Sequence, residues 1–369
     1  MKTLLLLLLT LFANFANAKN YYISLTGNDA NNGLTPLTAW KTITKFNTMF
    51  PAFVAGDSIL FKKGETFYGT ITPSTSGITI AAYGTGANPI ITGLNTVSSW
   101  TSLGGNIWEA TVPGGLSTLN MVVLNNSIIP MGRTPNADSA NSGYRMFEST
   151  SGNNSITDNQ LNSTINWSGA ELVARSQNFI TVKSKITTHT GGTLNFATIP
   201  GHSFKPNMGY FIQNDVRTLD QNGEWYYDTT GGTKKIKMYY TSTPPSIQVA
   251  TLTNLVRMAY HNGSIKSNIT FKGISFIGSN EIIFQATFCN NLTIDSCIFS
   301  FAGLDAINNR YSPHLTIKNS TITSVNNVGI RDYFTHLTYN LVIKNNTIKK
   351  IALHQECYQV GLICIMKLK

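Results

Sequence analysis

The last third of the chain repeats one strand pattern at a near-constant spacing, and this repeat limits the fold more than any other feature. Four eight-residue segments align, at 269–276, 292–299, 315–322 and 341–348, and their first residues lie 23, 23 and 26 positions apart. Each segment alternates apolar and polar residues with the two-residue period of a β-strand. One such strand per repeat predicts stacked coils in which equivalent residues lie above one another.

Stacking these segments places apolar residues in continuous inward columns. The predicted columns are Ile269/Leu292/Leu315/Leu341, Phe271/Ile294/Ile317/Ile343, Phe276/Phe299/Ile322/Ile348 and Phe284/Ile307/Ile330. On the outside, Asp295 alternates with lysines such as Lys318, and we expect Asn319 and Asn345 to bond through their amides. The helical segment and the Leu-x-x-Leu-x-Leu signature of leucine-rich repeats are absent. The pattern therefore predicts an all-β fold, a right-handed single-stranded parallel β-helix.

The first 18 residues match a secretory signal rather than a structural element. Lys2 is followed by the apolar run 4–12, and Ala16-Asn17-Ala18 matches an A-x-A cleavage site. The run is too short for a membrane-spanning helix, which needs roughly 20 apolar residues. We expect a mature chain that begins at Lys19, is secreted and is not stably inserted in a membrane.

The remaining sequence divides into a β-helix over 19–351 and an atypical tail over 352–369. Apolar residues at three- and four-residue steps from Trp40 to Phe50 predict a helix that caps the first coil. Residues 95–253 are irregular and predict an inserted β-rich region, with a hairpin over 224–240. The tail shows no further coil, and we interpret it as a truncation or a shifted reading frame.

Charge and cysteine content limit the partners. Only 12% of residues are charged, and the formal net charge is +10. This excess favours an acidic glycan over nucleic acid as the partner of an exported protein, with simple solubility as the alternative. The four cysteines show no metal-binding spacing, and Cys297 lies on an inward position, where a free thiol packs as a small apolar residue. We expect a monomer and no metal site.

Candidate site residues cluster after the second strand of successive coils. The predicted catalytic residues are Asp305, Arg331, Asp332 and His336, and the predicted substrate-binding residues are Asn308, Arg310, Tyr311 and Tyr333. Arginine binds carboxylates through two hydrogen bonds, and aromatic rings stack on sugar faces. This combination favours an anionic polysaccharide as substrate.

Two mechanisms remain open on these residues. In β-elimination, Arg331, Arg310 or His336 acts as the base or neutralises a uronate, with Ca²⁺ as a possible cofactor. In hydrolysis, Asp305 and Asp332 flank the bond, which requires the intervening turn to fold back. Structural alternatives are a surface ion pair between Arg331 and Asp332, a turn held by Asp305, and Tyr333 covering the core. Elimination is favoured because carboxylates are few.

Three stretches resemble the right-handed parallel β-helix proteins of the pectate-lyase-like superfamily. They are Tyr21–Ser24 with Gly27-Asn28-Asp29 and Trp40–Ile43, Leu219-Asp220 with Gly223–Asp228, and the coils from Asn268 onward. The resemblance implies an exported carbohydrate-active protein but no single reaction, because the superfamily includes lyases, hydrolases and non-catalytic proteins. We therefore predict a polysaccharide lyase, with a glycoside hydrolase, a non-catalytic glycan-binding protein or an inactive fragment as alternatives.

Overall fold

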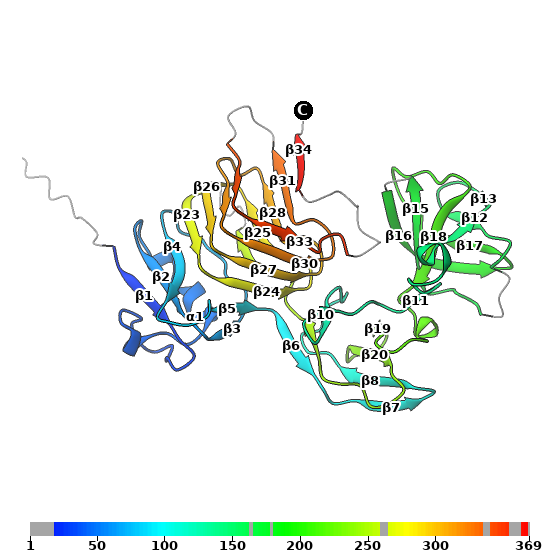
Figure 1. Ribbon diagram of the computed structural model, residues 1–369, viewed down its shortest axis with the longest axis horizontal. Helices are drawn as coiled ribbons and strands as arrows, with labels where there is room; N and C mark the ends of the chain where they lie inside the picture. Colours follow the sequence, from blue (N-terminus) through cyan, green and yellow to red (C-terminus); the bar gives the residue numbers. More distant parts are fainter. Residues whose placement is uncertain are drawn as a thin grey trace, which may run out of the picture.

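The computed structural model describes residues 18–161, 165–177, 180–258, 265–334, 340–353 and 363–367. The chain forms a parallel β-helix, seen on the left of Figure 1, from which two β-rich units extend to the right. The predicted all-β class, the parallel β-helix, the capping helix and the inserted region are thus confirmed.

Three parallel sheets make up the β-helix, and each coil contributes one strand to each sheet in its regular part. Sheet A contains β1 (Asn20–Ile23), β2 (Ser58–Lys62), β4 (Thr79–Tyr83), β23 (Lys266–Lys272), β26 (Cys289–Asp295), β29 (Thr316–Lys318) and β32 (Val342–Lys344). Sheet B contains β3 (Thr66–Tyr68), β5 (Ile90–Thr92), β24 (Ser275–Ser279), β27 (Ile298–Ala302), β30 (Thr321–Val325) and β33 (Thr347–Lys349). Sheet C contains β22 (Asn254–Met258), β25 (Ile282–Thr287), β28 (Ile307–Arg310), β31 (Ile330–Phe334) and β34 (Ile363–Lys367).

The inward columns have the predicted register. Phe271 pairs with Ile294 in sheet A, Phe276 with Phe299 in sheet B, and the equivalent positions of the following coils continue each column. Their side chains form the main core, and Phe276 and Phe299 stack with ring centroids 5.3 Å apart. Cys297 is buried and free, as predicted, and burial raises the pKa of its thiol to about 12.

The turn from sheet A to sheet B is the same in each regular coil. Gly273, Ser296, Asn319 and Asn345 all adopt left-handed φ values of 67°, 56°, 53° and 55° at this turn. Glycine and asparagine tolerate this conformation better than most residues. The predicted bond between the Asn319 and Asn345 amides is wrong, because Asn319 instead donates to Asp295 on the preceding coil at 2.9 Å.

A short helix covers the first coils. Helix α1 (Ile43–Thr48) lies between the 3₁₀ turns η1 (Pro36–Thr38) and η2 (Phe50–Ala52), and its Ile43 and Phe46 are buried. Its N-terminus is fixed by Thr42, whose hydroxyl accepts from the Lys45 N–H and donates to Asp29. The ring of Phe46 meets Phe61 of β2 edge to face. The helix therefore joins the core of the β-helix and shields its first strands.

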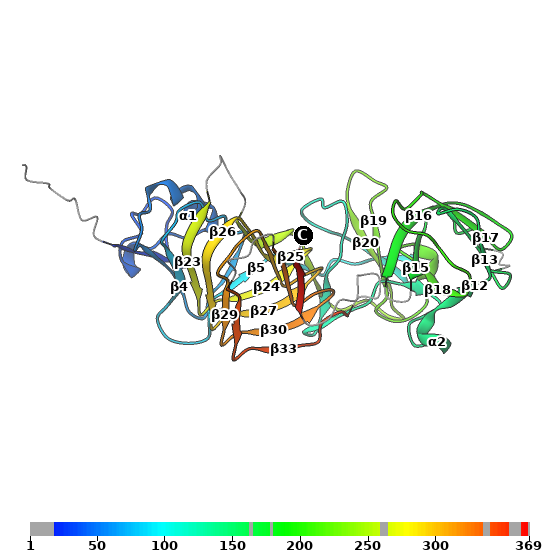
Figure 2. The ribbon, with the colours of Figure 1, turned by 90° about the horizontal axis from the view of Figure 1, so that it is seen from above.

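Two inserted β units separate β5 from β22. The proximal unit consists of a sheet of β6 (Leu94–Val97), β9 (Val122–Leu124), β10 (Ser127–Ile128) and β21 (Ile247–Ala250), and a sheet of β7 (Thr101–Gly104), β8 (Ile107–Thr111), β19 (Trp225–Asp228) and β20 (Lys235–Tyr239). The distal unit contains β11 (Arg133–Thr134), α2 (Ala140–Gly143), β12 (Arg145–Phe147), β13 (Ser149–Thr150), β14 (Ser155–Thr157), β15 (Glu171–Gln177), β16 (Ile180–Thr190), β17 (Thr193–Phe196) and β18 (Met208–Gln213). Figure 2 shows the distal unit at the end of the molecule opposite α1. Each unit has its own apolar core.

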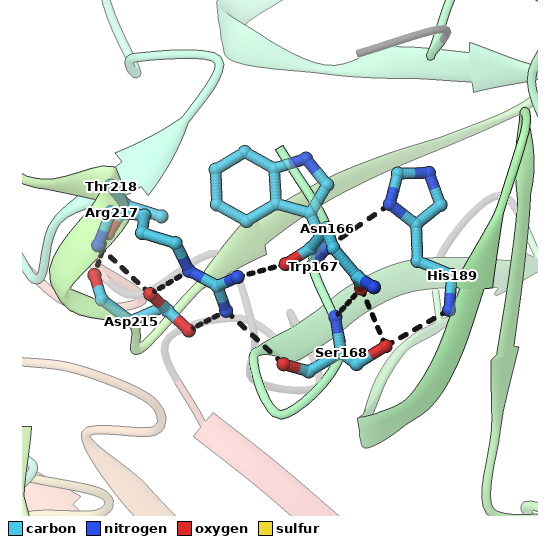
Figure 3. A network of polar contacts seen from close by, with 7 residues as sticks. All are labelled: Asn166, Trp167, Ser168, His189, Asp215, Arg217 and Thr218. Carbon is cyan, nitrogen blue, oxygen red and sulfur yellow. Dashed lines mark hydrogen bonds and ion pairs between the residues drawn. The ribbon is translucent and has the colours of Figure 1, made fainter. Parts of the chain in front are cut away.

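A polar network fastens the distal unit to the segment that returns to the proximal unit. In Figure 3, Arg217 of η3 (Val216–Thr218) binds the Asp215 carboxylate and donates to the backbone carbonyl of Ser168 at 3.2 Å. The backbone N–H of Trp167 donates to Nδ1 of His189 on β16 at 3.2 Å. The guanidinium of Arg217 also lies 5.5 Å from the Trp167 ring centroid. These contacts hold the distal sheet against the returning chain.

Asparagines join the proximal unit to the β-helix. The Asn120 N–H donates to the Asn280 side-chain oxygen at 2.8 Å, and the Asn326 amide donates to the Asn120 carbonyl at 2.9 Å. Gly303 lies on the coil between that of Asn280 and that of Asn326. An added Cβ at Gly303 would stand 2.0 Å from the Asn280 carbonyl oxygen and 3.0 Å from the Asn120 Cβ. Only glycine fits this contact.

The tail contributes a strand that the sequence did not predict. Strand β34 pairs in parallel with β31 at the edge of sheet C. Residues 363–366 alternate isoleucine with cysteine and methionine, which fits the period of a strand. The prediction that no coil element follows residue 351 is therefore wrong for this segment.

Removing an aromatic ring from the inner column should destabilise the whole β-helix. We expect Phe299→Ala to lower the free energy of unfolding by about 3–5 kcal/mol, because it leaves a cavity inside the stack. Its neighbour Ile298 is 37% exposed, so Ile298→Ala is the matched control and should cost much less. Urea denaturation followed by circular dichroism measures both, and equal losses would contradict the assigned faces of β27.

Candidate active site

A buried ion pair forms the centre of the candidate site on sheet C. Asp305, just before β28, and Arg331 of β31 are 3% and 7% exposed. The Arg331 Nε donates to Asp305 Oδ2 at 2.6 Å, and its Nη2 donates to Oδ1 at 3.1 Å. This bidentate contact joins two successive coils.

Three further donors surround the Asp305 carboxylate. The side-chain amides of Asn308 and Asn327 each donate to it at 3.0 Å, and the Val328 N–H donates at 3.2 Å. Together with Arg331, these groups give the carboxylate five hydrogen bonds. These donors fix the orientation of the carboxylate.

Arg331 is held as a cation. Burial lowers its pKa, but the hydrogen bond and the charge of Asp305 outweigh burial, and the net pKa of the guanidinium is raised. Its Nη1 also donates to the Tyr333 hydroxyl at 3.4 Å. A guanidinium with a raised pKa is a poor base, so this geometry suits charge stabilisation better than proton abstraction.

Asp332 lies on the opposite side of the strand from Arg331. Successive residues of a strand point to opposite faces, and Asp332 is fully buried, with Oδ1 accepting from the Asn309 amide at 2.7 Å. The interpretation of Arg331 and Asp332 as a surface ion pair is therefore wrong. Burial raises the pKa of Asp332, with the Asn309 bond opposing the shift, and favours its neutral form.

Cationic and aromatic side chains occupy the outer face beside the ion pair. The Arg310 guanidinium lies 5.0 Å from the Tyr333 ring centroid, and its Nε donates to Asn308 at 3.3 Å. Tyr311 is 37% exposed and stacks on Phe288 at 5.0 Å. Tyr333 is half-buried and lies on this outer face rather than in the core. The structure thus brings together Asp305, Asn308, Arg310, Arg331 and Tyr333, whereas His336 lies outside the described residues.

Two further residues, neither marked by the repeat pattern, lie on the coils that precede Arg331. Arg257 of β22 is exposed and pairs with Gln285, in the column that continues to Asn308 and Arg331. It was missed because β22 precedes the regular repeat, although Val256 aligns with the inward Phe284. The alignment of Val256 with Phe284 is the sequence signal that could have placed Arg257 on the outer face.

The second overlooked residue is Glu281, just before β25. Its backbone carbonyl accepts from the Leu304 N–H at 2.8 Å, which puts it one coil below Leu304 and diagonal to Asp305. With about 4.8 Å between strands and about 3.3 Å per residue, its Cα lies about 6 Å from the Asp305 Cα. Glu281 is half-buried, and its carboxylate makes no hydrogen bond or ion pair with other described residues. Two carboxylates in unlike environments therefore lie on adjacent coils.

Within the residues that the structure describes, no group of three or more His, Cys, Asp or Glu side chains is placed to hold a metal ion. The helices of the same residues include none that is long and apolar enough to cross a membrane.

Comparison with solved structures places the fold among β-helix proteins. A structure titled "Glycoside hydrolase" superposes with a TM-score of 0.66 at 14% identity, over 93% of this chain and 86% of that chain. The complex of XylC with xylose gives a TM-score of 0.56 at 14% identity, over 94% of this chain but only 56% of XylC. No protein-family model and no curated protein matches the sequence. The resemblance is confirmed for the β-helix fold, while the narrower pectate-lyase-like superfamily stays a prediction.

Removing the Arg331 side chain should lower the free energy of unfolding, because the residue is buried rather than exposed. Truncating one partner of a buried ion pair typically costs about 3–5 kcal/mol, because the other charge stays buried and unpaired. We expect this loss for Arg331→Ala, measured by urea denaturation. The double variant Asp305→Ala/Arg331→Ala should recover part of it, and two additive losses would show that the charges are uncoupled.

Replacing Asp332 should change the pH dependence of stability. A raised pKa in the folded state means that folding retains a proton that the unfolded chain releases, so stability falls as pH rises from the ordinary Asp pKa through the folded pKa. Asp332→Asn should remove this loss and gain stability over the native chain at neutral pH but not below pH ~3.8.

Asp295→Asn is the matched control for this experiment. The pKa of Asp295 is lowered, first by the Asn319 hydrogen bond, so its contribution to stability is present above the ordinary pKa and is lost as pH falls. Unfolding free energies from pH 3 to pH 8 should therefore shift in opposite senses for the two variants. A pH-independent difference between Asp332→Asn and the native chain would contradict a buried neutral Asp332.

Proposed function

We propose that this chain is a glycoside hydrolase that acts on an anionic polysaccharide bound across the outer face of sheet C. The observation that carries the proposal is the unpaired carboxylate of Glu281 one coil from Asp305, whose carboxylate is fixed by Arg331. Glycoside hydrolysis uses two carboxylates with different protonation behaviour.

The two carboxylates have complementary roles in this proposal. Asp305 accepts five hydrogen bonds that fix its carboxylate, and its proposed role is to stabilise the positive charge that develops at the anomeric carbon. Glu281 has no fixed partner and delivers the proton to the departing glycosidic oxygen. Their backbones lie on adjacent coils, about 4.8 Å apart by strand spacing, and the proposal requires their carboxyl groups to lie roughly 5 to 9.5 Å apart.

Side chains around this pair supply binding groups for an acidic sugar chain. Arg257 and Arg310 are exposed on the same face, and guanidinium groups bind carboxylates through two hydrogen bonds. The exposed Tyr311 ring, supported from behind by Phe288, offers a flat apolar surface for a sugar ring. The net charge of +10 favours approach of a polyanion. A polymeric substrate fits an exported protein, as expected from residues 1–18.

Hydrolysis has more support here than the elimination predicted from the sequence. Elimination needs a base beside the uronate, and Arg331, one of the predicted candidates, has a raised pKa and two bonds to Asp305. The two solved structures above are a glycoside hydrolase and a xylose complex by title, which agrees with hydrolysis on such a scaffold. Arg331 instead fixes the carboxylate.

Glu281→Gln should remove hydrolysis and preserve binding. Loss of a general acid typically costs 10²- to 10⁴-fold in rate, and we expect a fall in kcat of about that size. New reducing ends, measured on pectin, alginate and glycosaminoglycan panels, report hydrolysis, whereas absorbance from unsaturated products reports elimination. Affinity for the same polymers should stay within about twofold.

Glu148→Gln, on the exposed surface of the distal unit, is the matched control and should retain full activity. Unsaturated products that persist in Glu281→Gln would contradict hydrolysis in favour of elimination. Binding without products of either kind in the native chain would favour a non-catalytic glycan-binding protein. Normal hydrolysis by Glu281→Gln would exclude Glu281 as the acid.

A further inference from the structure

A polar cavity lies where the proximal and distal units meet. It has a volume of about 70 Å³. Its lining comes from the loop before β9, from β15, β16 and the chain after β18, and from the hairpin β19–β20: Ser117, Thr118, Leu119, Asn120, Met131, Glu171, Lys183, Asn214, Tyr227 and Thr229. The network around Arg217, drawn in Figure 3, fixes the distal wall directly after Asn214. Both inserted units thus form the cavity.

Hydrogen bonds join the cavity to the candidate active site through Asn120. Asn120 lines the cavity and accepts from the Asn326 amide at 2.9 Å. The next residue, Asn327, donates to the Asp305 carboxylate at 3.0 Å. The loop of Asn120 is held on the coil below as well, because the Asn280 amide donates to the Thr118 carbonyl at 3.0 Å. Hydrogen bonds thus link the cavity lining to the Asp305 carboxylate through Asn326 and Asn327.

The walls of the cavity combine an unsatisfied acceptor with apolar surface. Asn214 Oδ1 is buried and has no hydrogen-bond partner among the described residues. Leu119 and Met131 are 2% and 8% exposed and form the apolar part of the lining. The ammonium of Lys183 lies 3.9 Å from Glu171 Oε1, so the wall carries a neutralised pair of charges. A buried acceptor without a donor costs free energy, which a ligand N–H would recover.

We infer that this cavity is a specificity subsite for the acetamido group of an N-acetylated sugar. The inference rests on the proposed binding of glycan to sheet C. A volume of about 70 Å³ leaves room for the four heavy atoms of an acetamido group. The acetamido N–H donates to Asn214, and its methyl group packs on Leu119 and Met131. The substrate class is then a polysaccharide that combines uronate and N-acetylhexosamine.

The test compares two oligosaccharides by isothermal titration calorimetry on the full chain. One alternates glucuronate with N-acetylglucosamine, and the other carries hydroxyl groups in place of the acetamido groups. Asn214 has a φ of 56°, so Asn214→Gly removes its amide without straining the backbone. We expect this variant to bind the acetamido oligosaccharide about five- to tenfold more weakly, as for one neutral hydrogen bond, and the hydroxyl oligosaccharide unchanged.

Asn207→Gly is the matched control, because Asn207 has a φ of 66° in the same unit, is exposed and does not line the cavity. Equal affinity of the native chain for both oligosaccharides, or an equal loss for both in Asn214→Gly, would overturn the subsite and leave a water-filled cavity. Because binding is measured, the outcomes separate from those of the hydrolase proposal. If the native chain prefers the acetamido oligosaccharide but hydrolyses neither, only the subsite proposal is supported. If it hydrolyses glycans but binds both oligosaccharides equally, only the hydrolase proposal is supported.

Discussion

Parallel pairing of coils in register is the constraint on which the rest of this structure depends. Because each strand hydrogen-bonds to the same position of the next coil, side chains are ordered in columns about 4.8 Å apart. Inside, the columns of Phe271 and Phe276 build one core over successive coils. Outside, the same geometry places Gln285, Asn308 and Arg331 in a line. Any groove on sheet C is built from such lines.

The ion pair of Asp305 and Arg331 shows what this geometry adds to a repeat. The two residues are 26 positions apart in the chain, close to one repeat, so stacking brings them onto neighbouring coils. Burial makes the pair costly unless every donor and acceptor is satisfied, and the asparagines around it meet that requirement. The result is a buried ion pair that links two coils behind the exposed face.

The inserted units are fixed against the coils that carry the candidate site. Asn120 packs against Gly303 so closely that no side chain fits there, and this contact fixes the proximal unit on the coils that carry Asp305. The distal unit is fixed in turn by Arg217. A regular solenoid offers a uniform outer face, whereas this chain adds a small polar cavity lined by its inserted units.

The sequence by itself determined the solenoid, its inward columns, the capping helix and the buried Cys297, because each depends on a local period that a single chain displays. Only the tertiary structure decided the partners of polar residues. Arg331 lies beside Asp332 in sequence but pairs with Asp305, since neighbours on a strand face opposite ways. Arg257 was found only in the structure because pairing between coils is set by register, which the irregular spacing before residue 269 concealed. Glu281 was found only there because it aligns with the apolar Leu304, so no column of polar residues marked it. The contacts of the inserted units follow from chain segments about 160 residues apart, for which no period exists.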